Sequence, residues 1–267
     1  LKAVFLYSWP LLMASALSIV GLKADHVIVA SVLGTLTYAL YSVGAFEIPV
    51  FNLLQNSVTS VLMPKITELL KANDFEQATN LWRRAAAKTA AVTFPLAVLL
   101  MINADLVVKA LFGVRYVDAT TVFVLFNSFV FLRVITFGLA LRAMDKTHIE
   151  LMLTLIYLLF SVVGSYFMVN YYSIEGAAIW AIVNTIILSL ALSLYTLRFS
   201  GGRLSLWRIY PIRHFTVGLM LFFLVRFLQG INILSFFHPL MVSAFYSILV
   251  ILVWLGFLRF MIREDIA

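Results

Sequence analysis

The sequence contains no cysteine and carries little charge. Without cysteine the chain has no disulfide bond, no thiolate metal ligand and no cysteine nucleophile. Only 12% of its 267 residues are charged and 63% are hydrophobic, whereas soluble globular domains are typically about 25% charged and about 45–50% apolar. A soluble fold of this length could not cover so much apolar surface, so the composition indicates a protein embedded in a lipid bilayer.

The sequence also lacks the short motifs of common enzymes and ATP-driven pumps. It has no Walker loop, no Gly-x-Gly-x-x-Gly, no Gly-x-Ser-x-Gly and no His-Glu-x-x-His. The four histidines fall in different predicted loops or span ends, where an imidazole most often serves as a polar group at the water boundary. We therefore expect no enzymatic activity, no cofactor and no metal site.

Long apolar runs dominate the sequence instead. In hydrocarbon every backbone polar group must be paired within the protein, which leaves only helices or closed barrels. The runs are far longer than the alternating strands of about ten residues in a barrel, and about 20 apolar residues cross a bilayer as a helix. The fold class predicted is an all-α polytopic bundle of about eight spans, near residues 4–24, 37–62, 87–104, 119–141, 150–171, 174–197, 214–233 and 240–260.

The longest break between spans, residues 64–88, contains a helix signal of its own. Asn73-Asp74 followed by Glu76-Gln77 is typical of a helix N-cap with its partner three residues on. Leu81 and Trp82 continue an apolar face. This pattern predicts a short amphipathic helix at the membrane surface that leads into the third span.

The basic residues predict the orientation of the bundle, because loops rich in Lys and Arg stay on the cytoplasmic side. With the N-terminus inside, only Lys109 and Arg115 fall in outer loops. The inner side receives Lys2, Lys65, Lys71, Arg83, Arg84, Lys88, Arg142, Lys146, Arg198, Arg203, Arg208, Arg213, Arg259 and Arg263. We therefore expect a multi-pass protein of the cytoplasmic (inner) membrane with both termini in the cytoplasm. The net charge of +7 then reflects this bias and contact with anionic lipid, not a nucleic-acid partner.

Ionisable residues inside spans are costly and tend to mark pathways. Glu47 falls in the middle of the second span and Arg133 near the middle of the fourth, while Lys23 and Asp25 lie toward the outer end of the first. Glu47 and Arg133 either form a static pair that fixes helix packing or line a polar cavity. Lys23 and Asp25 are two residues apart and therefore point to different sides of a helix.

Polar residues and prolines add to this pattern. Asn52 and Gln55 lie three apart on the second span and share one face, which indicates an aqueous or headgroup-filled interior. Pro10, Pro49 and Pro95 lie in or at the edge of spans, where proline bends a helix, and such bends often serve gating in transporters.

An ordered set of short motifs across residues 9–184 resembles one family. The set comprises Trp9-Pro10-Leu11, Asp25 with Val29 to Gly34, Tyr41-Ser42-Val43, Met63-Pro64-Lys65-Ile66, Phe94-Pro95-Leu96, Leu111-Phe112-Gly113 with Tyr116 and Ala119, Gly176-Ala177-Ala178 and Asn184. In this order and spacing they resemble the C-terminal half of the Wzx-like polysaccharide flippases of the multidrug/oligosaccharidyl-lipid/polysaccharide exporter superfamily. The stretch from 198 to the end carries only generic hydrophobic spans.

The resemblance implies a pair of pseudosymmetric helical bundles around a central basic cavity. Residues 1–197 would form the second bundle of about six spans, and residues 198–267 a basic cytoplasmic loop with two additional spans. The implied activity is movement of an undecaprenyl-diphosphate-linked oligosaccharide to the outer leaflet by alternating access. The implied partners are that lipid-linked substrate, the bilayer, an N-terminal bundle absent from this sequence and polysaccharide polymerase machinery. The sequence begins with Leu, which favours a fragment of a longer protein.

Two other functions remain open at this point. A cation-coupled multidrug antiporter of the same superfamily would use a mid-membrane acid such as Glu47 for its ion. A membrane-embedded polysaccharide polymerase would be expected to carry a large extracytoplasmic loop, and none of the predicted outer loops is long.

Overall fold

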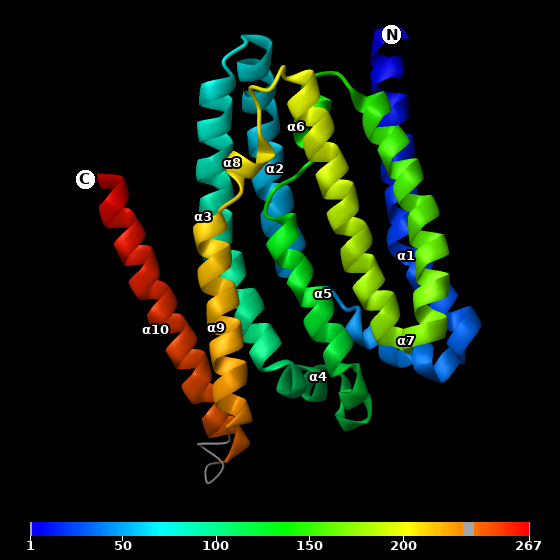
Figure 1. Ribbon diagram of the computed structural model, residues 1–267, viewed down its shortest axis with the longest axis vertical. Coiled ribbons are helices and arrows are strands. Elements are labelled where there is room, and N and C mark those ends of the chain that lie inside the picture. Colours follow the sequence, from blue (N-terminus) through cyan, green and yellow to red (C-terminus); the bar gives the residue numbers. More distant parts are fainter. Residues whose placement is uncertain (1, 232–237, 267) are drawn as a thin grey trace.

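The computed structural model describes residues 2–231 and 238–266 and is all-helical over that part of the chain, as predicted. Long helices run roughly side by side, and both termini lie toward one end of the bundle (Figure 1). The α-helices are α1 Lys2–Gly44, α2 Pro49–Lys71, α3 Phe75–Ile102, α4 Ala104–Phe112, α5 Thr120–Arg133, α6 Leu139–Ala143, α7 Thr147–Phe199, α8 Leu206–Ile209, α9 Ile212–Gly230 and α10 Pro239–Ile266. A 3₁₀ helix, η1, spans Val114–Ala119 between α4 and α5.

Six helical stretches of the described chain are long and apolar enough to cross a membrane. They are Ser8–Gly44, Phe75–Ile102, Val114–Arg133, Thr147–Phe199, Ile212–Gly230 and Pro239–Met261. The protein is therefore a multi-pass membrane protein. The eight predicted passes correspond to these six stretches once α7 is counted as two antiparallel legs and α2, which is less apolar, is added (Figure 1).

The two legs of α7 are separated at Tyr172 and Ser173, whose backbone leaves helical geometry. Contacts across the hairpin show that the legs are antiparallel. The Trp180 indole N–H donates to the Phe160 carbonyl at 2.9 Å, and the Asn184 amide donates to the Tyr157 carbonyl at 3.1 Å. The predicted spans 150–171 and 174–197 are thus the two legs of α7. A tight reversal joins them at the end of the bundle opposite the termini (Figure 1).

Helix α1 reverses in a similar way at Gly34, whose φ of 80° and ψ of 175° are conformations that glycine alone adopts readily. The Tyr41 hydroxyl donates to the Asp25 carboxylate, although 16 residues of straight helix would separate them by about 24 Å. Residues 35–44 therefore return toward the first leg. The second predicted span, 37–62, is not one helix: it consists of this return leg, a non-helical segment at 45–48, and α2.

Helix α3 runs without a break from Phe75 to Ile102, so the short surface helix predicted before the third span is wrong. The predicted cap is confirmed, because the Asp74 carboxylate accepts the Gln77 N–H at 3.0 Å. Trp82 is only 2% exposed and packs within a cluster contributed by α2, α6 and α8. Its apolar face is covered by neighbouring helices rather than by lipid headgroups, so the helix can continue straight into the membrane.

The remaining helices complete the bundle around α3. A cluster of buried residues joins α3 and α5 to α9 and α10, with Phe94, Phe131 and Trp254 among them. The Trp254 indole donates to the Ala91 carbonyl at 2.9 Å. The last two long helices are therefore packed on α3, on the side of the bundle away from α1 and α7 (Figure 1).

Candidate functional site

The structure contains a cavity of about 640 Å³ within the bundle. Its walls come from both legs of α1, from the segment at 45–48, from α5 and from both legs of α7. Four of the predicted site residues, Lys23, Asp25, Glu47 and Arg133, line it. Aromatic side chains contribute a second part of the wall: Tyr38, Phe46, Phe126, Phe129 and Tyr157.

Arg133 and Glu47 form a bidentate ion pair at the cavity wall. Nη1 of Arg133 donates to Glu47 Oε2 at 2.8 Å, and Nη2 donates to Oε1 at 2.7 Å. The Arg133 side chain is 26% exposed and that of Glu47 is 36% exposed. The residues are therefore paired with each other and also line the cavity.

Both members of this pair lie at interruptions of a helix, not within one. Glu47 belongs to the non-helical segment 45–48, and Arg133 is the last residue of α5. Helix α5 continues directly from η1, and together they form the stretch Val114–Arg133 that is long enough to cross a membrane. The interruption follows this stretch and separates it from α6.

The start of α2 is shaped by its own sequence. Pro49 occupies the first turn, where its missing N–H costs no hydrogen bond and its fixed φ favours the helix. Pro49 thus marks the break that precedes α2. The Asn52 amide, one turn further on, donates to Glu47 Oε2 at 3.0 Å and orients the carboxylate toward Arg133.

The other two predicted prolines do not interrupt their helices. Pro10 lies inside α1, and Pro95 lies inside α3. The reversal of α1 occurs at Gly34 instead. A role of these prolines in gating stays a prediction.

Asp25 is the most deeply buried acid of the cavity wall, with 3% of the residue exposed. Its carboxylate accepts the Tyr41 hydroxyl and the backbone N–H of His26, the latter at 2.8 Å. The His26 ring packs edge-on against Tyr41 at 5.1 Å between centroids. Lys23 is exposed and Asp25 is buried, and both line the same cavity, so their placement on different sides of the helix stays a prediction.

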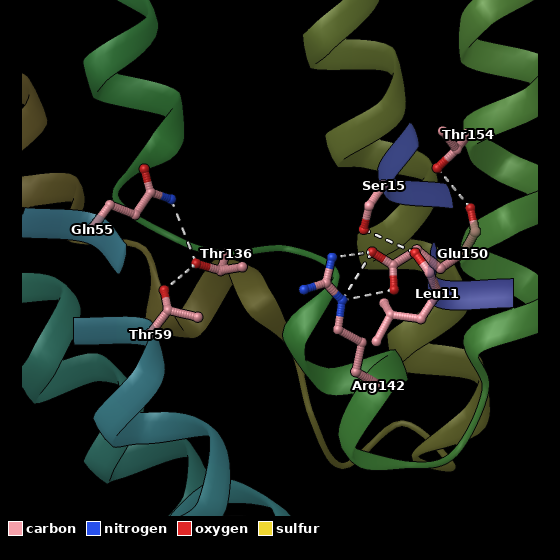
Figure 2. A network of polar contacts seen from close by, with 8 residues as sticks. All are labelled: Leu11, Ser15, Gln55, Thr59, Thr136, Arg142, Glu150 and Thr154. Atoms are coloured by element: carbon pink, nitrogen blue, oxygen red, sulfur yellow. Dashed lines mark hydrogen bonds and ion pairs between the residues drawn. The ribbon is translucent and has the colours of Figure 1, made fainter. Parts of the chain in front are cut away.

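Gln55 does not line the cavity and belongs to a second polar cluster, shown in Figure 2. Its amide lies 3.5 Å from the Thr136 hydroxyl, which is also 2.9 Å from the Thr59 hydroxyl. Thr136 sits in the interruption between α5 and α6, so these contacts tie that interruption to α2. The polar face of α2 predicted from the sequence therefore contacts two places: Asn52 does not line the cavity but bonds to Glu47 on its wall, and Gln55 belongs to this cluster.

A residue of the loop between α8 and α9 caps the C-terminal end of α5. The Tyr210 hydroxyl donates to the Phe131 carbonyl at 2.8 Å, which satisfies an acceptor in the last turn of the helix. Burial raises the pKa of Tyr210, so its hydroxyl remains a proton donor.

Figure 2 also shows a second arginine fork, which the sequence did not indicate. Arg142 on α6 donates through Nη2 to Glu150 Oε1 at 2.6 Å and through Nε to Oε2 at 2.9 Å. Glu150 opens the first leg of α7, and its side chain is only 9% exposed. The sequence places Arg142 in a predicted loop and Glu150 at the start of a predicted span. Their ion pair depends on the packing of α6 against α7, which the sequence does not show.

The cavity residues that sequence reasoning missed come mainly from aromatic and hydroxyl side chains. Tyr157, Ser161 and Thr185 reach it from the two legs of α7. Hydroxyl side chains are common in membrane spans, so the spacing of these three residues in the sequence does not indicate that they line one cavity.

Comparison with known proteins agrees with a membrane protein related to polysaccharide synthesis. Residues 1–121 match a family described as "Polysaccharide biosynthesis protein". The capsular polysaccharide biosynthesis protein CapF of Staphylococcus aureus is 23% identical over 180 residues, which cover 67% of this chain and 46% of CapF. The chain thus spans about half the length of that relative. No solved structure matches the chain significantly. Lys23, Asp25 and Glu47 lie within the part that matches this family, whereas Arg133 lies beyond it.

Proposed function

We propose that this protein is part of a flippase that moves a lipid-linked oligosaccharide, carried on undecaprenyl diphosphate, across the cytoplasmic membrane for polysaccharide synthesis. The similarity to polysaccharide biosynthesis proteins supports the pathway. The observation that carries the transport role is the charged cavity of about 640 Å³ between helices of the bundle, with Arg133 and Glu47 on its wall.

The cavity has the chemistry that such a substrate needs. A guanidinium fork matches the geometry of a phosphate and binds it through two parallel hydrogen bonds. Arg133 is held in place by its ion pair and by the Phe129 ring, 5.4 Å from the guanidinium carbon. The aromatic wall formed by Tyr38 and Phe126 offers flat apolar faces to sugar rings.

The interrupted helices provide a basis for alternating access. Segment 45–48 lies at the cavity, and the stretch between α5 and α6 begins directly after Arg133 on the cavity wall; both lack the hydrogen-bond ladder that stiffens a helix. Transporters commonly form their sites from such discontinuous helices and move one bundle against another around them. In this proposal the chain acts together with a further helical bundle of the whole protein, and polymerase machinery receives the product.

Arg133→Ala tests the proposal in cells whose surface polysaccharide depends on this protein. We expect surface polysaccharide to be lost while the variant remains inserted in the membrane, because the anionic headgroup has lost its fork. Arg84→Ala is the matched control, since Arg84 is an exposed arginine of α3 outside the cavity. Normal polysaccharide in the Arg133→Ala strain would contradict the proposal.

A cation-coupled antiporter is the second candidate, and Asp25 is the observation that favours it. A carboxylate 3% exposed and bonded to a tyrosine hydroxyl can bind and release a proton or a sodium ion. Asp25→Asn should abolish drug efflux driven by an imposed proton or sodium gradient if this function holds. Glu47→Gln is the companion variant, and gradient-driven transport that is unchanged in both would contradict ion coupling through these acids.

A further inference from the structure

Glu47 occupies the position at Arg133 that an anionic ligand would take. Both of its oxygens face the guanidinium fork at 2.7 and 2.8 Å, and the Asn52 amide adds a third hydrogen bond at 3.0 Å. A carboxylate and a phosphate bind an arginine fork with the same two-point geometry. The protein therefore satisfies its own cavity arginine with an internal anion.

The Arg133–Glu47 and Arg142–Glu150 forks differ in accessibility. In the Arg142–Glu150 fork the acid is 9% exposed and lies in the first helical turn of the first leg of α7, which restrains its backbone. In the Arg133–Glu47 fork the acid is 36% exposed, faces the cavity and lies in a non-helical segment. Glu47 can therefore leave its partner without unwinding a helix.

A displaced Glu47 would keep favourable partners. Lys23 lines the same cavity and is exposed, so its ammonium group offers a displaced Glu47 carboxylate an opposite charge within the cavity. Asn52 can retain its hydrogen bond from the first turn of α2. Asp25 cannot compete for Arg133 in this way, because it is buried and hydrogen-bonded to Tyr41.

We infer that Glu47 competes with the anionic headgroup for Arg133, holding the fork when the cavity is empty and yielding to a ligand phosphate. The inference rests on the proposed transport of a diphosphate-linked substrate. Glu47 is then a specificity-determining residue. A diphosphate displaces the carboxylate because it brings more negative charge to the Arg133 fork, whereas a weakly charged anion does not. Release of the headgroup is aided when Glu47 returns to Arg133.

The test is binding of inorganic pyrophosphate to the purified chain in lipid nanodiscs, measured by calorimetry. Glu47→Gln keeps the shape and removes the competing charge, so pyrophosphate should bind at least about tenfold more tightly than to the unaltered chain. The Glu47→Gln variant should also bind chloride and inorganic phosphate more tightly than the unaltered chain does. The ratio of its affinity for pyrophosphate to its affinity for these anions should therefore fall. Arg133→Ala, alone or combined with Glu47→Gln, should bind no pyrophosphate.

Glu68→Gln is the matched control, because Glu68 pairs with Lys65 at 2.8 Å on an exposed part of α2, outside the cavity. Its affinity should equal that of the unaltered chain. If Glu47→Gln does not yield folded protein, Glu47→Asp shortens the side chain, opens the fork and should raise the affinity less. Unchanged or weaker pyrophosphate binding in these Glu47 variants overturns the inference.

The two proposals fail in different ways. If surface polysaccharide depends on Arg133 but the Glu47 variants bind pyrophosphate no more tightly, the competition is wrong and the flippase stands. If the Glu47 variants bind pyrophosphate through Arg133 but polysaccharide does not depend on Arg133, the competition stands and the flippase is wrong.

Discussion

The Arg142–Glu150 fork gives the sharpest stability prediction for this protein. It joins α6 to the first leg of α7 just beyond the interruption that follows Arg133 (Figure 2). The Glu150 side chain is 9% exposed and that of Arg142 is 33% exposed. Gly138 makes room for the carboxylate, since a Cβ at that position would lie 2.6 Å from Glu150 Oε1.

Glu150→Gln removes the negative charge and preserves the volume of the side chain. Breaking a buried ion pair by removing one partner costs about 3–5 kcal/mol. Arg142 is one-third open to solvent, which relieves part of that cost. We therefore expect the free energy of unfolding to fall by about 3 kcal/mol, near the lower end of this range.

The measurement is reversible unfolding in mixed detergent micelles, with Glu68→Gln as the control. The Lys65–Glu68 pair is 55% and 67% exposed, and such surface pairs contribute about 1 kcal/mol or less. A loss in Glu150→Gln no greater than in Glu68→Gln would refute the reasoning. Replacing both members of the fork, with Arg142→Met and Glu150→Leu, should recover much of the stability because no buried charge is left unpaired.

Two glycine substitutions test the turns and contacts of the bundle by the same unfolding measurement. Gly164→Ala should cost about 1–3 kcal/mol through overpacking, because a Cβ there would lie 1.8 Å from the Trp180 indole; unchanged stability would show that the α7 legs are not in this contact. Gly34→Ala should also cost about 1–3 kcal/mol, since its φ of 80° and ψ of 175° disfavour a side chain although the space around it is open. A neutral Gly34→Ala would mean that α1 does not reverse at this residue.

The passes of the bundle were predictable because they depend on local quantities. Hydropathy over about 20 residues measures the cost of leaving a segment in hydrocarbon, and this cost does not depend on neighbouring helices. The cap at Asp74 was predictable for the same reason, since its partner Gln77 is three residues away.

The interruptions were less predictable. Segment 45–48 follows a return leg that depends on the turn at Gly34, and the stretch after Arg133 carries no proline to mark it. Hydropathy runs through both places without a break, so spans 37–62 and 119–141 looked continuous. Their backbone is stabilised by distant groups, such as the Tyr210 hydroxyl on the Phe131 carbonyl.

For the candidate site, the sequence by itself identified charges that lipid would not tolerate, and this was enough to single out Lys23, Asp25, Glu47 and Arg133. Only the tertiary structure decided that Arg133 forms a fork with Glu47, that Asp25 is bonded to Tyr41, and that Gln55 belongs elsewhere. The physical reason is that the cost of burying a charge is set by the residue and its depth, whereas its partner is set by how helices far apart in the sequence pack together.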